Sequence, residues 1–261
     1  MKGRDKLPTR RRRESKTELY HIIVKGINRE RIFNQQREKI YFKRIILKHL
    51  DVINVEIYCY CIMSNHAHFI IRAEIHDLSR FMAFVLSEYA SYYNFKHHRN
   101  GHVFQNRFTS ECIEDERYFW SCLRYIHLNP VKAGMIKMPV RYRYSSMGEY
   151  AAEKAGLIHQ KAILFYKNSF QDFQQFQEFH KSREELVFQD ISDEMALQQS
   201  EAALVLAEDV FKEKKLALLI QVFEEKGIRQ EYIQRVKQRL KISNKKAREL
   251  CELTMNKLQN E

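Results

Sequence analysis

The sequence is poor in residues that break regular structure, and it contains no long apolar run. Its 261 residues include only 7 Gly and 3 Pro against 12% aromatic residues. This excludes a collagen-like or low-complexity chain and predicts regular helices and strands. No apolar run approaches the roughly 20 residues that cross a bilayer, and the charged segment 2–16 lacks the apolar stretch of a secretory signal. We therefore expect a soluble cytoplasmic protein that contacts no membrane.

Cysteine is also scarce, and its spacing does not suggest pairing. The odd number of five, with no CxxC spacing, indicates free thiols in a reducing compartment. Cys59 and Cys61 share one face of an apolar predicted strand. A zinc site there needs two further ligands.

The positive charge is concentrated in one part of the chain. Residues 1–150 hold 27 Lys+Arg and 15 Asp+Glu, an excess of 12, whereas residues 151–261 hold 18 of each. A concentrated positive field attracts polyanions such as nucleic acid. An acidic protein or a membrane surface fits the charge equally well, as does a merely basic soluble protein.

Residues 1–18 are predicted to form a flexible basic arm. The arm contains Arg10, Arg11, Arg12 and Arg13 and few apolar residues. Such an arm contacts phosphates without reading sequence. A solvated tail with no partner is the alternative interpretation.

The apolar pattern predicts an α+β domain. The order is strand, helix, two strands, helix, strand, helix, and the short turn at Ser64-Asn65 implies antiparallel pairing with helices on one face of the sheet. The last helix is expected to end around Asn129, because Pro130 follows. The predicted strands cover 19–26, 55–63, 66–73 and 109–113, and the helices cover 35–50, 77–97 and 115–129.

The remainder of the chain is predicted to be helical. Residues 141–158 form a connector, and beyond Gln160 the sequence is polar and rich in Glu, Lys and Gln. Three short helices are expected at 212–226, 230–240 and 244–258, with breaks at Gly227 and Ser243. A helix-turn-helix is one interpretation, but short helical triplets are common and the region is electrically neutral.

Two motifs suggest a chemical site. His66 and His68 lie two apart in a predicted strand, so both imidazoles face the same side and can hold one metal ion. Tyr125 and Asn129 lie four apart on a predicted helix, on one face. A tyrosine hydroxyl attacks phosphorus only when a cation neutralises the phosphate, and Asn129 offers a third, oxygen ligand. Arg124 points roughly 100° away from Tyr125 on the helix, so its role at a phosphate is open.

Five segments in order resemble the single-tyrosine HUH transposases, specifically their REP-associated tyrosine transposase branch. The most specific are the HxH segment and YIHLNPVKAGM, and the resemblance spans about residues 19–150. The five segments are YHIIVKGINRERIF (20–33), CIMSNHAHFII (61–71), GHVFQNRF (101–108), YIHLNPVKAGM (125–135) and YRYSS (142–146).

The resemblance implies a ferredoxin-like catalytic domain at 19–150 that acts on single-stranded or hairpin DNA. His66, His68 and Asn129 would bind Mg²⁺ or Mn²⁺, and Tyr125 would be the nucleophile that forms a 5′-phosphotyrosine intermediate. Residues 151–261 would be a separate helical region. A monomer or homodimer, cytoplasmic and associated with the nucleoid, is expected. The predicted phosphate contacts are the basic arm together with Arg107, Lys132, Arg141 and Arg143.

Two departures and two rival functions accompany this resemblance. Ser64 stands where relatives commonly carry Pro, and Phe104 where they often carry Trp. The first rival is a protein that binds hairpin DNA or RNA without cutting it, and the second is a metal hydrolase that uses activated water. The presence of all four site residues favours the covalent transposase and endonuclease.

Overall fold

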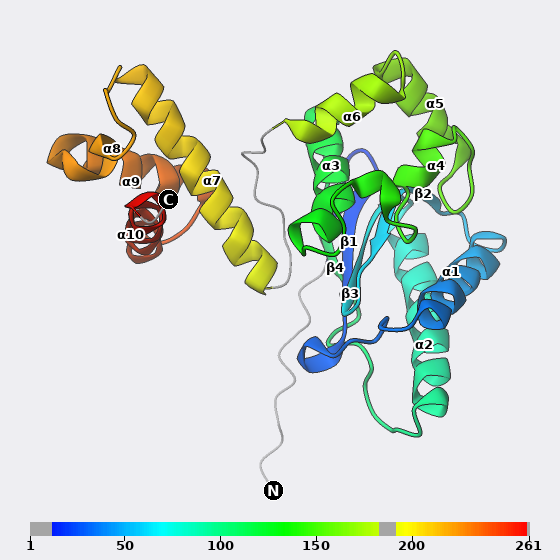
Figure 1. The fold of residues 1–261 in the computed structure, drawn as a ribbon. Coiled ribbons are helices and arrows are strands. Elements are labelled where there is room, and N and C mark those ends of the chain that lie inside the picture. Colours follow the sequence, from blue (N-terminus) through cyan, green and yellow to red (C-terminus); the bar gives the residue numbers. More distant parts are fainter. Residues whose placement is uncertain (1–11, 183–191, 260–261) are drawn as a thin grey trace, which may run out of the picture. The chain divides into compact units, whose positions relative to one another are not determined.

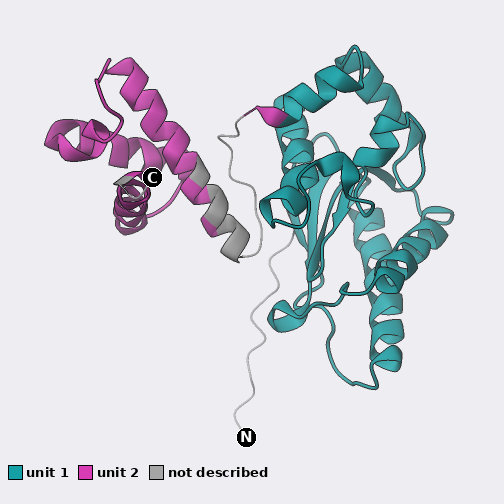
Figure 2. Ribbon diagram, viewed as in Figure 1, with its two compact units in different colours: residues 1–180 teal, residues 181–261 magenta. Residues whose placement is uncertain are grey.

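The computed structural model describes residues 12–182 and 192–259, and it divides the chain into two compact units, residues 1–180 and 181–261 (Figure 2). Arg10 and Arg11 of the predicted basic arm lie outside the described residues. Within the described ranges, no helix is long and apolar enough to span a membrane.

The first unit is built on a four-stranded antiparallel sheet. Its strand order is β2-β3-β1-β4, and α1 and α2 are the crossover connections, as in ferredoxin-like domains. This confirms the predicted α+β class. The elements are β1 (Leu19–Lys25), η1 (Ile27–Arg29), α1 (Gln36–Leu50), β2 (Glu56–Ile62), β3 (His66–Arg72), α2 (Ile75–Lys96) and β4 (Thr109–Cys112).

The two crossover helices share one face of the sheet, and α3 (Glu116–Lys132) covers the other face (Figure 1). The predicted single helical face therefore holds for α1 and α2 but not for α3. Phe69 of β3 points toward α1, where its ring centroid lies 6.3 Å from that of Phe42. His68, the neighbouring residue, points to the opposite face, because side chains alternate along a strand. There its ring lies 5.7 Å from that of Tyr125 on α3.

Helix α3 continues through Pro130 to Lys132, so the prediction that it ends around Asn129 was wrong. Proline removes one backbone donor and restricts the residue before it, but in the last turn of a helix this costs little beyond the bond to Ile126. The Asn129 side-chain amide donates to the Tyr125 carbonyl at 3.2 Å. Beyond the end of the helix at Lys132, Gly134 takes a left-handed φ of 67°.

Helices beyond residue 146 pack back onto α3 and belong to the first unit. Trp120 of α3 lies 4.9 Å from Phe165 and 5.0 Å from Phe170, ring to ring. The compact unit therefore extends to His180. The extent of a catalytic domain, predicted as 19–150, is a functional boundary and stays a prediction. The helices beyond residue 146 are α4 (Met147–Ala151), α5 (Gln160–Ser169) and α6 (Phe173–Lys181), and the short η2 (Pro139–Arg141) precedes them.

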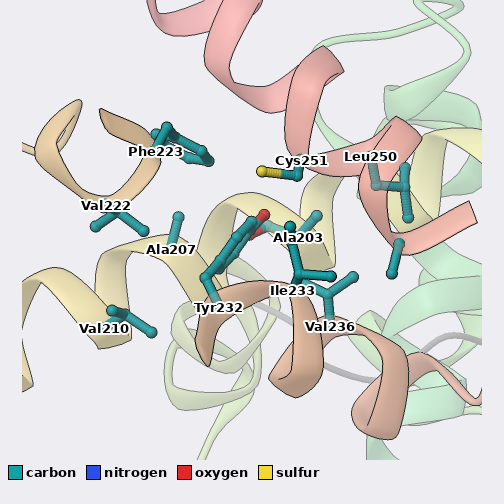
Figure 3. Close-up of a cluster of buried hydrophobic side chains, with 11 residues drawn as sticks. Ala203, Ala207, Val210, Val222, Phe223, Tyr232, Ile233, Val236, Leu250 and Cys251 are labelled. Carbon is teal, nitrogen blue, oxygen red and sulfur yellow. The ribbon is translucent and has the colours of Figure 1, made fainter. Parts of the chain in front are cut away.

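The described residues of the second unit form helices joined by loops, as predicted, and these helices have a core of their own (Figure 3). The expected helix at 212–226 was wrong, because α7 ends at Glu213 and Lys215 takes a left-handed φ of 51°. Gly227 lies inside a helix and is no break. The helices are α7 (Ser192–Glu213), α8 (Gln221–Glu224), α9 (Lys226–Leu240) and α10 (Asn244–Gln259). A helix-turn-helix role for them stays a prediction.

Candidate active site between the sheet and helix α3

The two histidines of the HxH segment lie together on the α3 face of β3. Both are buried, and their ring centroids are 4.8 Å apart with the ring planes at 90°. The strand periodicity that predicted this pairing is therefore confirmed. Burying two imidazoles side by side costs free energy unless their ring nitrogens form hydrogen bonds or bind a metal ion.

Each histidine is oriented through its Nδ1 atom. His66 Nδ1 lies 2.7 Å from the Asn65 side-chain oxygen, which can only accept, so Nδ1 carries the proton. His68 Nδ1 lies 3.1 Å from His21 Nε2. The Nε2 atoms of both His66 and His68 are buried. Metal-binding histidines are commonly held in this way, with one nitrogen fixed by a neighbour and the other directed at the ion.

His21 of β1 and Glu111 of β4 complete this arrangement, and the sequence motifs predicted neither residue. His21 stacks on His68 with ring centroids 5.3 Å apart, and its Nδ1 lies 3.7 Å from a Glu111 carboxylate oxygen. The carboxylate favours a proton on His21 Nδ1, which leaves His21 Nε2 to accept from His68. The series of contacts from Glu111 through His21 to His68 depends on the register of three strands. Alternation in the strand LYHIIVK nevertheless places His21 on the opposite face from its apolar neighbours Tyr20 and Ile22.

Tyr125 lies over the same face, and Asn129 follows one helical turn later. The Tyr125 ring centroid is 5.7 Å from that of His68 and 6.2 Å from that of His21. The Lys132 ammonium lies 5.7 Å from the Tyr125 ring centroid. Tyr125 is only 4% exposed and Asn129 3%. Neighbouring side chains must therefore move before a substrate can reach the tyrosine hydroxyl.

Arg124 is directed away from this site, as its helical position suggests. Its guanidinium carbon lies 4.9 Å from the Phe179 ring centroid, and Nη1 donates to the Phe179 carbonyl at 3.4 Å. Arg124 therefore joins α3 to α6.

The predicted phosphate contacts that the structure describes lie in different surroundings. Arg12 and Arg107 line a common pocket, and Lys132 lies beside Tyr125. Arg13 forms an exposed ion pair with Glu114 at 3.4 Å. Arg141 and Arg143 are exposed on the segment that precedes α4.

The residues predicted to bind the metal are two imidazoles and one amide, an unusual set for Mg²⁺ or Mn²⁺. Among the residues with described side chains, no three His, Cys, Asp or Glu groups are placed to hold a metal together. The predicted set contains two histidines and the amide oxygen of Asn129, which lies outside those four types. Imidazoles favour later transition metals by affinity, so availability would have to select Mg²⁺ or Mn²⁺.

Phe104 acts in packing at the position where the resembling family often carries Trp. Its ring centroid lies 5.9 Å from that of Tyr89 and 6.5 Å from that of Phe33, and it is buried. At the other departure, the Ser64 carbonyl accepts from the Phe33 backbone N–H at 2.8 Å.

Comparison with known proteins finds a match to a transposase family over part of the chain. Residues 15–129 match the family described as "Transposase IS200 like", a range that contains His66, His68, Tyr125 and Asn129. The chain is also similar to a solved structure of a REP-associated tyrosine transposase bound to a REP hairpin, with 19% identity and a TM-score of 0.47, over 59% of this chain and 91% of that one. No curated protein matches the chain. The family match confirms the predicted resemblance to transposases over residues 15–129.

Proposed function

We propose, from the match of residues 15–129 to the IS200-like transposases, that this protein cuts and rejoins one strand of hairpin or single-stranded DNA through a covalent bond to Tyr125. The observation that supports this most directly is the placement of the Tyr125 ring 5.7 Å from His68, itself 4.8 Å from His66. A tyrosine that attacks phosphorus needs a cation bound close to the phosphate, and the two histidines beside Tyr125 are the groups that could hold one.

The proposed reaction is a phosphoryl transfer to tyrosine. The Tyr125 hydroxyl loses its proton, and its oxygen forms a bond to phosphorus while the bond from phosphorus to the 3′-oxygen breaks. The leaving oxygen takes up a proton and becomes a free 3′-hydroxyl, and the 5′-phosphate stays on Tyr125. The ester keeps the energy of the broken bond, so a 3′-hydroxyl can reverse the step and join strands without ATP.

His66, His68 and Asn129 would hold the divalent ion. When bound, Mg²⁺ or Mn²⁺ would neutralise charge on the phosphate oxygens. His21 and Glu111 would fix the His68 ring, and Asn65 the His66 ring. Lys132 adds positive charge beside the tyrosine.

Removal of the metal, or of a metal ligand, should abolish the covalent product. We expect wild-type protein with labelled hairpin DNA and Mg²⁺ or Mn²⁺ to give a slow-migrating, protease-sensitive adduct on a denaturing gel. A chelator or His66→Ala should lower adduct formation by roughly a hundredfold or more, because a metal supplies several kcal/mol of transition-state stabilisation. His76→Ala, at an exposed histidine of α2, should leave it unchanged. Equal adduct formation with and without the chelator would contradict the proposal.

A non-catalytic hairpin-binding protein is the second candidate function. The burial of Tyr125, 4% exposed, favours it, because a nucleophile must meet its substrate. The adduct assay separates the two functions: DNA retention without any adduct, across a panel of hairpins and both metals, would make this protein a binder.

The remaining expectations stay proposals of the same kind. These are a monomer or homodimer, a cytoplasmic protein that associates with the nucleoid through DNA, and a DNA-binding role for the helices of the second unit.

A further inference from the structure

A pocket of about 510 Å³ lies between α2 and the segment 101–108. One wall is formed by small residues of α2, namely Ser79, Ala83, Ser87 and Ala90, whose spacing of three or four places them on one side of the helix. The other wall is the GHVFQNRF segment. The volume lies in the range of sites that bind one small molecule or nucleotide.

The pocket carries two positive charges and no negative one among its lining residues. Arg12 and Arg107 are the charged groups, and no Asp or Glu lines the pocket. The Arg12 guanidinium carbon lies 3.8 Å from the Phe108 ring centroid, and Nη1 donates to Ser79 Oγ at 3.5 Å. Burial, and then the charge of Arg107, lower the pKa of Arg12. An anion placed between the two guanidinium groups would be stabilised by both.

The rest of the lining suits a planar, partly polar ring. Val103, Phe104 and Leu86 supply apolar surface, and Gln105 and Asn106 each supply an amide donor and acceptor. Side-chain amides pair with base edges, and apolar or aromatic surfaces stack on base faces. A small inorganic anion would gain nothing from the apolar surface, so the lining favours a nucleotide.

The loop 101–108 that lines the pocket is hydrogen-bonded to the end of β1, which pairs with the strand that carries His66 and His68. Gln105 N donates to the Lys25 carbonyl, and Ile27 N to the Val103 carbonyl, each at 2.9 Å. Lys25 in turn lies opposite His66 in the pairing of β1 with β3. Two strand spacings, about 10 Å, therefore separate the backbone of Gln105 from that of His66.

We propose that this pocket binds one unpaired nucleobase of the DNA strand, with the adjoining phosphate between Arg12 and Arg107. The inference rests on the proposed function, because it assigns a place to the strand that flanks the phosphodiester attacked by Tyr125. The side-chain amides would hold the edge of the base and the apolar residues would stack on its face. The pocket would therefore select which base stands at one position of the unpaired DNA beside the hairpin.

The test compares two serines on the same helix. Ser87 lines the pocket and Ser91, one turn later, does not, and both are exposed. Ser87→Leu fills the pocket, and Ser91→Leu is the matched control. The probe is a DNA hairpin whose short unpaired flank has been selected from a randomised pool for tightest binding to the full-length wild type. Binding is measured by fluorescence anisotropy, with each flank base replaced in turn by an abasic site.

We expect one abasic position to weaken wild-type binding about tenfold or more, on the scale of a stacked base. Ser87→Leu should bind the intact flank as weakly as wild type binds that abasic probe, with no further loss from the abasic site. Ser91→Leu should behave as wild type. Arg107→Gln should lower the slope of log binding constant against log salt by about 0.7.

Two results would overturn the proposal: a wild type insensitive to every abasic site, or a Ser87→Leu variant with the full wild-type sensitivity. If Ser87→Leu unfolds at a lower temperature than Ser91→Leu, the Arg107→Gln slope decides instead. Adduct formation at Tyr125 without any dependence on flank bases would overturn the pocket and leave the proposed function standing. Absence of both hairpin binding and adduct in wild type would overturn both.

Discussion

Tyr125→Phe should abolish cleavage of hairpin DNA and leave DNA binding intact. The substitution removes only the hydroxyl, so the ring contacts with His68 and His21 are kept. Without that oxygen no covalent bond to phosphorus can form, and the rate should fall about 10⁴-fold or more, the scale on which covalent enzymes lose activity without their nucleophile. Strand cleavage and adduct formation on a denaturing gel, with binding measured separately, check this.

Tyr118→Phe is the matched control for this prediction. Tyr118 lies seven residues earlier on α3, two helical turns away. Burial, and then the negative charge of Glu111, raise the pKa of Tyr118, which disfavours its phenolate. Cleavage should therefore survive in Tyr118→Phe. If metal-dependent cleavage persists in Tyr125→Phe, the nucleophile is an activated water molecule and the covalent mechanism is refuted.

The sequence predicted the sheet and the pair His66 and His68 because local periodicity determines both. The alternation in β3 places the two imidazoles on one face wherever the strand pairs, and the turn at Ser64-Asn65 joins β2 to β3 as an antiparallel pair. Helical spacing likewise placed Asn129 one turn after Tyr125. These features depend on residues within one or two elements.

Features that depend on register or on distant packing were not predictable. The contact of His21 with His68 requires the offset between β1 and β3, and local periodicity does not give the offset between residues 47 positions apart. The pocket beside Arg107 requires a loop and a helix that meet only in the folded chain. Helix α3 also exceeded its predicted end, because a proline in the last turn removes little more than the backbone bond to Ile126.

A buried histidine pair, His127 of α3 and His180 of α6, joins segments far apart in the chain. His180 Nδ1 donates to the Phe176 carbonyl at 2.7 Å, so its Nε2 accepts from His127 Nδ1 at 3.0 Å. His127 Nε2 then accepts from Ser146 Oγ at 2.8 Å, and that oxygen accepts from the Tyr60 backbone N–H at 3.1 Å. In this arrangement both imidazoles are neutral, and burial favours that form.

Acid should therefore destabilise the first unit before its carboxylates are protonated. Burial, the largest cause, lowers the pKa of His180 to about 4, and burial lowers that of His127 too. In the unfolded state a histidine has a pKa near 6.5, so between about pH 6.5 and pH 4 the unfolded state binds more protons than the folded state. The stability that the neutral His180 contributes is therefore fully present above about pH 6.5 and is lost as pH falls toward 4. From pH 7 to 5, His180 alone should cost about 2 kcal/mol of unfolding free energy.

Urea unfolding at several pH values, followed by the fluorescence of Trp120, measures this loss. Trp120 is the single tryptophan and lies in the first unit, so the signal excludes the second unit. His180→Gln should reduce the pH dependence between 7 and 5 by about 2 kcal/mol, while the exposed-site control His76→Gln should keep it.

The pKa of Glu38 is lowered: burial alone would raise it, but hydrogen bonds from Lys96, the Gln35 backbone and His97 outweigh that effect. Its contribution is lost only below about pH 4.5, outside this window. A wild type with equal stability at pH 7 and pH 5 would show that the pair is protonated without cost, and the neutral hydrogen-bond chain would then be wrong.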